Sequence, residues 1–413
     1  MLSNRVLPYI LLAGVLVRLL FFVTTPVTGD ACFHYSIAKY ISTNLKLPTF
    51  EYVTGPDPFW WPPLFHVLTA AIYKLTGILT LSPFLFGSIG LVAFYLLCRR
   101  HYPDIAETAT LILSFLPFHV YYSSIGYVDS LIFLLAVSSY HLYLNYIKSG
   151  KGLLYPILTS ALCALTHYYG MVVPLSIAAH LFLRERKKAL LFIVAVMLLA
   201  SPAYIKNYLV FGNPIWPKLY GGFYPNSPSV QSLPLSVALR DISNPGRWVG
   251  VFFDFWIGAP NSGDDIMDNI NVGTSIYPLF TVFLLGWLIL ITASTLLMVK
   301  GVASVKEKRS LILPLLVFLI SLLAFALNGL SRMFVAFIPF MVIALALGYN
   351  SLKLKYTHYI LALALLSFIG GSYAYSYTYM NLRQAYQPFW DMMKAQIPSD
   401  AIVIMPFNLG ECL

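Results

Sequence analysis

The chain alternates long apolar stretches with short polar connections over most of its length. Eleven stretches are apolar enough to cross a membrane as helices: 7–23, 84–97, 106–121, 128–146, 153–165, 171–183, 189–205, 277–299, 311–326, 333–347 and 358–375. A hydrocarbon layer about 30 Å thick needs roughly 20 mainly apolar residues for each helical span. The pattern therefore predicts an all-α, polytopic transmembrane helix bundle of about eleven spans.

Two amphipathic helices of a different kind are predicted in the first long polar segment, 24–81. In GDACFHYSIAKYISTNL the apolar residues repeat on one helical face, and His34 lies off that face. WWPPLFHVLTAAIYKLTG predicts a second helix, which begins at two prolines and ends near Gly77. Both are interpreted as helices that lie in the membrane interface rather than cross it.

Two further long segments do not fit the alternation of membrane spans and short loops. Within 207–276, RWVGVFFDFWIG predicts an interfacial or re-entrant element, and the tail predicts a helix over 382–395 and a strand over 401–405. Long loops on one face usually carry function. We therefore divide the chain into a membrane module, residues 1–376, with outer loops 24–81 and 207–276, and a short or truncated C-terminal segment, residues 377–413.

Composition and charge agree with a membrane protein and predict its orientation. Hydrophobic residues make up 59% of the 413 positions, charged residues make up 10%, and the formal net charge is +10. Lys and Arg concentrate in the loops that lie inside when the N-terminus is cytoplasmic, and cytoplasmic loops carry an excess of positive charge. The sequence predicts a multi-pass cell-membrane protein with its long loops and C-terminus outside. Topology explains the basic charge, so nucleic acid is not an expected partner.

Two carboxylates stand at predicted outer span ends. Asp30 follows the first span and begins the first amphipathic helix, where a carboxylate could act as general base on a hydroxyl acceptor. Asp30 or Thr28 could equally cap that helix. Asp129 opens the fourth span in YVDSL, and it is either functional, a solvated helix end or a partner for Arg18.

Cations and imidazoles are predicted on the same outer side. Lys206 and Arg332 end the seventh span and open the tenth, where they could hold a phosphate together or merely extend to the headgroup level. His34, His66 and His167 match no metal-ligand spacing and are interpreted as polar interface residues.

Metal and nucleotide sites receive little support. The run DDIMD, with Asp264, Asp265 and Asp268, could bind a divalent cation, but a solvated loop is favoured. No cofactor is therefore assigned with certainty. No glycine-rich phosphate loop is present, so a membrane lipid is a better candidate than a nucleotide to carry an activated group. The four cysteines form no framework, and a Cys32–Cys412 bridge is the less favoured alternative.

These features occur in an order that resembles the C-type (GT-C) membrane glycosyltransferases. GDACFHYSIAKYI, WPPLFHVLTAAIYKLTG, YVDSLIFLLA, LTHYYG, SPAYIKNYLVFGNPIWP and SRMFVAFIPFMVIALA carry the resemblance. It covers roughly residues 1 to 350 and is strongest for the branch with the dolichyl-phosphate-mannose protein mannosyltransferases and the lipid A aminoarabinose transferases. SPAYIKNYLVFGNP is the best local match.

The resemblance implies a hexosyltransferase that takes a sugar from a polyprenyl or dolichyl monophosphate. Transfer to a protein, lipid or glycan acceptor would occur on the extracytoplasmic face, with inversion at the anomeric carbon. Asp30 would be the catalytic base, and substrate would be bound by Asp129, Lys206, Arg332, His34, His66, His167 and Trp61. Lys206 and Arg332 would stabilise the departing lipid phosphate.

The sequence also departs from the family's pattern. Many relatives carry an Asp-Glu pair where this chain has Asp30 and Ala31, a basic residue where it has Trp61, and a lysine where it has His167. The acceptor motif typical of oligosaccharyltransferases is absent. Two alternatives therefore stay open: a transporter or lipid flippase, and a non-catalytic member that binds polyprenyl phosphate within a glycan-assembly complex.

Overall fold

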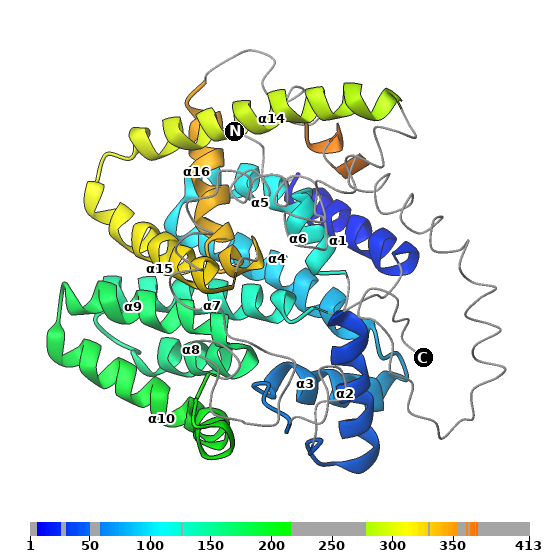
Figure 1. Cartoon of the computed structure of the whole chain (residues 1–413). Coiled ribbons are helices and arrows are strands. Elements are labelled where there is room, and N and C mark those ends of the chain that lie inside the picture. Colours follow the sequence, from blue (N-terminus) through cyan, green and yellow to red (C-terminus); the bar gives the residue numbers. More distant parts are fainter. Residues whose placement is uncertain are drawn as a thin grey trace.

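The computed structural model describes residues 6–25, 30–49, 58–124, 127–215, 278–328, 331–352, 361, 364–367 and 369–370. Throughout this part of the chain the regular structure is helical, with no β-strand (Figure 1). The elements are α1 (Leu7–Thr24), α2 (Asp30–Asn44), α3 (Leu64–Thr76), α4 (Leu81–His101), η1 (Pro103–Ile105), α5 (Ala106–Ser114), α6 (Pro117–Tyr122), α7 (Asp129–Ser149), α8 (Leu154–Thr166), η2 (Tyr168–Met171), α9 (Val172–Phe182), α10 (Arg186–Phe211), α14 (Pro278–Ser304), η3 (Lys308–Leu311), α15 (Ile312–Asn328), η4 (Ser331–Phe334) and α16 (Ile338–Asn350).

The all-α membrane architecture is confirmed, but the count of eleven spans is not. Among the described residues, five helical stretches are long and apolar enough to cross a membrane: Leu7–Thr24, Leu81–His101, Asp129–Ser149, Arg186–Phe211 and Lys308–Ala326. Five more are apolar but shorter: Leu64–Thr76, Leu154–Thr166, Tyr168–Phe182, Ile291–Ser304 and Ile338–Asn350.

The predicted third span, 106–121, is two helices rather than one. α5 ends at Ser114, and α6 begins at Pro117 after a break of two residues. Proline has no backbone N–H to continue the helical ladder and disfavours helical geometry in the residue before it, so a break at this point is expected. The periodicity of apolar residues runs through the break, which explains why it predicted a single span.

The surfaces of the long helices are those of a protein surrounded by lipid. α1 exposes Leu12 and Leu16 and buries Arg18 completely, and α10 exposes Leu191 and Leu198. A water-soluble helix would place these side chains the other way round. In a bilayer the polar group is protected inside and the apolar face contacts lipid.

The segment 24–81 contains the two predicted short helices, which pack side by side (Figure 1). α3 ends at Gly77, whose φ of 73° is the left-handed conformation that glycine tolerates best. Both helices bury polar residues. His34 is buried on α2 together with the apolar residues Phe33 and Ile37, while α3 buries His66 and exposes Leu75. His34 and His66 are therefore core residues of this pair of helices rather than polar residues at its surface.

The helices that position the site surround the central pair α4 and α7, which pack along each other. α8 packs on α7, and α10 packs on both α8 and α9. α1 packs against α4 and α5, while α15 covers α9 and α16 packs on α14 (Figure 1). Several predictions lie outside the described residues: the element RWVGVFFDFWIG, the acidic run DDIMD, the tail helix and strand, and most of the span over 358–375. Cys32 is disulfide-bonded, whereas Cys98 and Cys163 are free thiols.

Candidate active site

The predicted site residues lie at helix ends on one end of the bundle. Asp129 is the first residue of α7, His167 joins α8 to η2, and Lys206 is in the last turns of α10. The opposite ends of the same long helices carry basic residues such as Lys148 on α7 and Arg186 on α10. Each site residue is therefore separated from the basic ends by the length of a helix.

Asp129 is a buried carboxylate with a buried hydrogen-bond donor. Its side chain has no solvent exposure, and its Oδ1 accepts a hydrogen bond of 2.8 Å from the hydroxyl of Tyr169 on η2. The first turn of α7 also favours negative charge, because the helix dipole is positive there. The local fold thus provides both a hydrogen bond and a favourable field for an ionised Asp129.

Arg332 supplies positive charge to the same region from η4. Its guanidinium lies 5.6 Å from the ring centroid of Tyr127, which precedes α7. Arg332 also acts electrostatically on Tyr169 and on His34, so three separate chain segments meet around its charge. A cation at this position can attract an anionic substrate to the site through its electric field, before the two are in direct contact.

A pair of buried imidazoles joins α2 to α3. His34 Nδ1 and His66 Nε2 are 2.9 Å apart, so one ring donates a hydrogen bond to the other. Burial, together with the positive charge of Arg332, lowers the pKa of His34 from 6.5 to about 3. Burial and the neighbouring His34 also lower the pKa of His66. Both rings are therefore neutral at pH 7 and add no positive charge to the site.

Aromatic rings connect the imidazole pair to His167. The Trp61 ring lies 5.1 Å from His34 and 5.0 Å from His167, measured between centroids. Trp60 stacks on Trp61 at 4.1 Å and on Tyr168 at 5.7 Å. The indole N–H groups of Trp60 and Trp61 are buried and donate to no acceptor within the described residues. Buried indole N–H groups usually find a partner, so these two are available to a ligand with hydroxyl or phosphate oxygens.

The last turns of α10 contact the residues that precede α3. The Lys206 ammonium donates a hydrogen bond to the Phe59 carbonyl and lies 4.8 Å from the Phe59 ring centroid. Asn207 donates a 2.7 Å hydrogen bond to the Trp60 carbonyl. Phe59 in turn contacts His66, with ring centroids 5.9 Å apart. These contacts fix the segment before α3 against α10.

The structure thus links seven of the eight predicted site residues in one continuous set of contacts and electrostatic interactions. They are Lys206, His66, His34, Trp61, His167, Asp129 and Arg332. The eighth, Asp30, is the first residue of α2, one helical turn before His34, and its side chain lies outside the description. Its predicted role as base stays a prediction.

Sequence reasoning missed several residues of this region. Tyr169, Trp60 and Asn207 all make the contacts that join the helices, yet none was singled out. Tyr169 lies in LTHYYG and Asn207 follows Lys206 in SPAYIKNYLVFGNP, so both stand inside segments that carry the resemblance. Polar residues within one or two positions of a candidate site residue in these segments could therefore have been chosen as further candidates.

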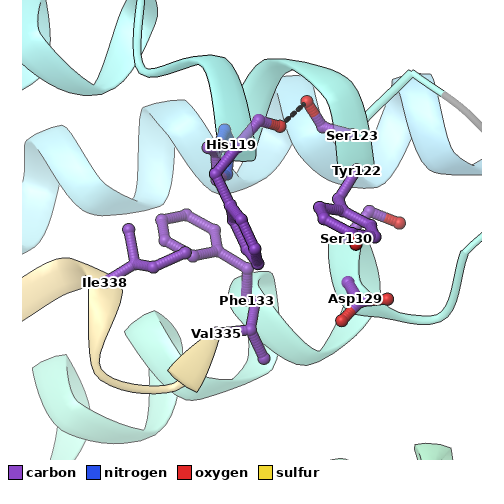
Figure 2. Close-up of a pocket in the computed structure, with 9 residues that line it drawn as sticks. His119, Tyr122, Ser123, Asp129, Ser130, Phe133, Val335 and Ile338 are labelled. Carbon is purple, nitrogen blue, oxygen red and sulfur yellow. Dashed lines mark hydrogen bonds between the residues drawn. The ribbon is translucent and has the colours of Figure 1, made fainter. Parts of the chain in front are cut away.

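A small pocket adjoins Asp129 (Figure 2). It holds about 170 Å³ of space between atoms, and Asp129 itself has no solvent exposure. Its walls come from α6, α7 and the segment that follows Arg332: Phe118, His119, Tyr122, Ser123, Asp129, Ser130, Phe133, Val335 and Ile338. Asp129 is therefore in a dry environment, where electrostatic interactions are stronger than in water. No cluster of three or more His, Cys, Asp or Glu residues suited to a metal occurs in the described part of the chain.

Comparison with known proteins supports one fold. No protein-family profile and no curated protein matches the chain in sequence. Two crystal structures match it at a TM-score of 0.54: ArnT from Cupriavidus metallidurans bound to undecaprenyl phosphate, at 13% identity, and an Archaeoglobus fulgidus oligosaccharyltransferase in the apo form, at 14% identity. The matches cover 97% and 98% of this chain, which spans 67% of the ArnT chain and 61% of the oligosaccharyltransferase.

Both neighbours are C-type glycosyltransferases. The chain has their fold, and the predicted resemblance is confirmed at that level. Because the sequence identities are low, the likeness establishes the architecture and leaves the activity to be argued from the site.

Proposed function

We propose that this chain is an inverting membrane glycosyltransferase that takes its sugar from a polyprenyl or dolichyl monophosphate. The observation that carries the proposal is the continuous site around Asp129, Arg332 and Lys206, on a fold shared with C-type glycosyltransferases. A carboxylate, two cations and hydrogen-bond donors without protein acceptors are the groups that transfer from a lipid phosphate requires.

In the proposed reaction Asp30 is the general base. The acceptor hydroxyl attacks the anomeric carbon, its proton passes to the Asp30 carboxylate, and the bond from the anomeric carbon to the phosphate oxygen breaks. Attack from the face opposite the phosphate inverts the configuration. Because Asp30 begins α2, its position depends on a helix fixed to α3 by the His34–His66 hydrogen bond.

The leaving group is a lipid phosphate whose negative charge grows as the bond breaks. Arg332 and Lys206 would stabilise that charge, and Arg332 is well suited because its planar guanidinium can bind two phosphate oxygens at once. Lys206 is half-buried and already donates to a backbone carbonyl, so phosphate would compete with that carbonyl for the ammonium. The neutral His34 and His66 would contribute hydrogen bonds rather than charge.

The remaining predicted residues would hold the sugar and the acceptor. Asp129, oriented by Tyr169, would help to shape the site for the sugar and the acceptor. Trp61 and His167 form an aromatic wall of the kind that packs against the apolar face of a sugar ring. No cofactor is required by this scheme, because the donor is already activated. A divalent cation at the acidic run DDIMD stays a separate prediction.

Two observations favour this donor and this side of the membrane. The crystal structure of ArnT, which has the same fold, contains undecaprenyl phosphate. The site also lies at helix ends opposite the basic ends of α7 and α10, and basic ends are typical of the cytoplasmic side. The disulfide at Cys32 on α2 fits an oxidising compartment, which is expected outside the cytoplasm. We therefore propose an extracytoplasmic site that receives protein, lipid or glycan acceptors.

Mass spectrometry of lipid-linked sugars and glycoconjugates tests this proposal. Membranes with and without the protein are compared, and purified protein in lipid is then supplied with polyprenyl-phosphate sugars. We expect Asp30→Asn and Asp30→Ala to abolish transfer while the protein remains folded. Asp104→Asn is the matched control, because Asp104 is an exposed acid in η1 and should leave transfer unchanged.

The outcomes separate the three functional classes. Full transfer by both Asp30 variants would exclude Asp30 as the base. Movement of the lipid across the bilayer without transfer would support a flippase, and binding of polyprenyl phosphate with neither movement nor transfer would support a non-catalytic member.

A further inference from the structure

Arg18 is a fully buried arginine in the middle of the membrane helix α1, and the proposed chemistry does not use it. The ion pairs formed by the described residues do not include Arg18. A cation in such a place is costly unless its donors find acceptors; both Nη groups of Arg18 have them, whereas Nε has none among the described residues. The contacts of Arg18 therefore indicate what it does.

Its guanidinium binds backbone carbonyls and one imidazole. Nη1 donates to the Gly14 carbonyl at 2.7 Å and to the Ser114 carbonyl at 3.2 Å. Nη2 donates to the Leu113 carbonyl at 3.2 Å and lies 2.6 Å from Nδ1 of His119. Arg18 thus links α1 to the end of α5 and to α6.

The two α5 carbonyls are exposed by the break before Pro117. The last four carbonyls of a helix lack the regular donors of that helix, and across this break Leu113 receives one long backbone hydrogen bond, of 3.4 Å, from the Leu116 N–H. In lipid each such group must be satisfied from inside the protein. The planar fork of Arg18 satisfies Leu113 and Ser114 together, so it stabilises α5 and α6 as two helices at a fixed angle.

The same guanidinium fixes the chemical form of His119. Arginine only donates hydrogen bonds, so Nδ1 of His119 accepts, and the hydrogen of the neutral ring is on Nε2. The ring of His119 then packs edge-on against Phe133 of α7, with centroids 4.1 Å apart. Phe133 is one helical turn after Asp129, and all three residues line the pocket beside Asp129 (Figure 2).

From these contacts we infer that Arg18 is a positioning residue of the proposed glycosyltransferase site. It fixes α1, which leads into α2 and Asp30, against α6, which packs on α7 beside Asp129. The two carboxylates of the site belong to segments 99 residues apart in the sequence (129 − 30). Arg18 joins α1, the helix before the one that begins with Asp30, to α6, the helix before the one that begins with Asp129, and it needs no contact with substrate to do so. The inference rests on the proposed function for its effect on rate.

The test compares Arg18→Met with Arg18→Lys and with a control in the same bundle. Methionine keeps a long side chain but removes the guanidinium donors to both α5 carbonyls and to His119. Lysine keeps the charge but lacks the fork, so we expect it to restore part of the lost rate. Tyr143→Phe is the control, because it removes a buried hydrogen bond to His180 about 21 Å along α7 from Asp129, at 1.5 Å of rise per residue.

Two measurements are made on each purified variant. Transfer kinetics, normalised to folded protein, should show kcat reduced at least tenfold in Arg18→Met with the donor KM within twofold of wild type. Hydrogen exchange should become faster over residues 30–44 and 117–124 and stay unchanged in α8, α9 and α10. Tyr143→Phe should keep both the kcat and the exchange of residues 117–124.

Each outcome decides one question. Unchanged kcat per folded molecule in both Arg18 variants, or faster exchange spread evenly over the protein, would overturn the positioning role. If wild-type protein transfers no sugar, the proposed function fails, and hydrogen exchange alone then decides whether Arg18 holds α6 in place. If Arg18→Met does not fold, Arg18→Lys provides both measurements.

Discussion

Removing the hydroxyl of Tyr169 is the sharpest test of the site around Asp129. Tyr169→Phe deletes one donor and leaves the ring in place. The Tyr169 hydroxyl lies 2.8 Å from Oδ1 of Asp129, and both side chains are buried. Because both side chains are buried, loss of the hydroxyl leaves Oδ1 of Asp129 without this donor.

The expected magnitude follows from the type of hydrogen bond. A hydrogen bond to a charged group contributes about 1.5–3 kcal/mol. Since about 1.36 kcal/mol corresponds to a tenfold change in rate, loss of this bond in the transition state lowers kcat/KM by about 10-fold to about 160-fold. The same loss should reduce stability, because the carboxylate of Asp129 stays buried.

The assay measures initial rates of transfer over a range of donor concentrations, with thermal unfolding measured on the same samples. Tyr140→Phe is the matched control: Tyr140 is also buried on the helix that Asp129 opens, and its hydroxyl has no hydrogen-bond partner among the described residues. We expect this control to behave as wild type. Equal kcat/KM for Tyr169→Phe, Tyr140→Phe and wild type would refute the argument that Tyr169 orients Asp129 for the reaction.

Three further predictions concern charge, pH and backbone packing. Arg332→Met and Lys206→Met should each lower kcat/KM at least tenfold. If both cations bind one phosphate, the double variant should lose less kcat/KM than the product of the two single losses. A loss in the double variant equal to that product would show that the two cations act independently. Because the folded-state pKa of His34 is about 3 against 6.5 in the unfolded chain, stability should fall as pH drops from about 6.5 to about 3, by up to about 1.4 kcal/mol per pH unit. His34→Gln should flatten this dependence in melting measurements, and an unchanged slope would contradict it. Gly170→Ala should displace η2 and reduce both stability and transfer, since its new Cβ would lie 2.1 Å from the Cys163 carbonyl oxygen. Wild-type melting and activity in this variant would show that η2 can shift to accommodate the Cβ at no cost.

The sequence predicted the helices well where local signals agree. α3 begins after Pro63 and ends at Gly77, as the proline and glycine signals indicate. α7 begins at Asp129, one residue from the predicted start of the fourth span. These boundaries depend on residues adjacent in the chain, so local chemistry is enough to find them.

Features that depend on distant contacts were not predictable in this way. Arg18 lies within the first predicted span and was considered only as a partner for Asp129; its acceptors at Leu113 and Ser114 are about 100 residues away, next to the break after α5. The burial of His34 was missed for a related reason. Its partner His66 is on another helix, and only that pairing makes burial of a polar ring favourable.

Two positions at which the sequence departs from the pattern it resembles are in contact with each other. That resemblance leads us to expect a basic residue at Trp61 and a lysine at His167, and in this chain the two rings lie 5.0 Å apart. Two cations at that distance would repel one another unless an anion lay between them, whereas an indole and an imidazole can pack directly. If the resemblance holds at both positions, the two departures would form a single local change, from two cations to two rings that pack directly. It follows that stabilisation of a donor phosphate would fall to Arg332 and Lys206, because the other side chains at this wall, His34 and His66, are neutral at pH 7.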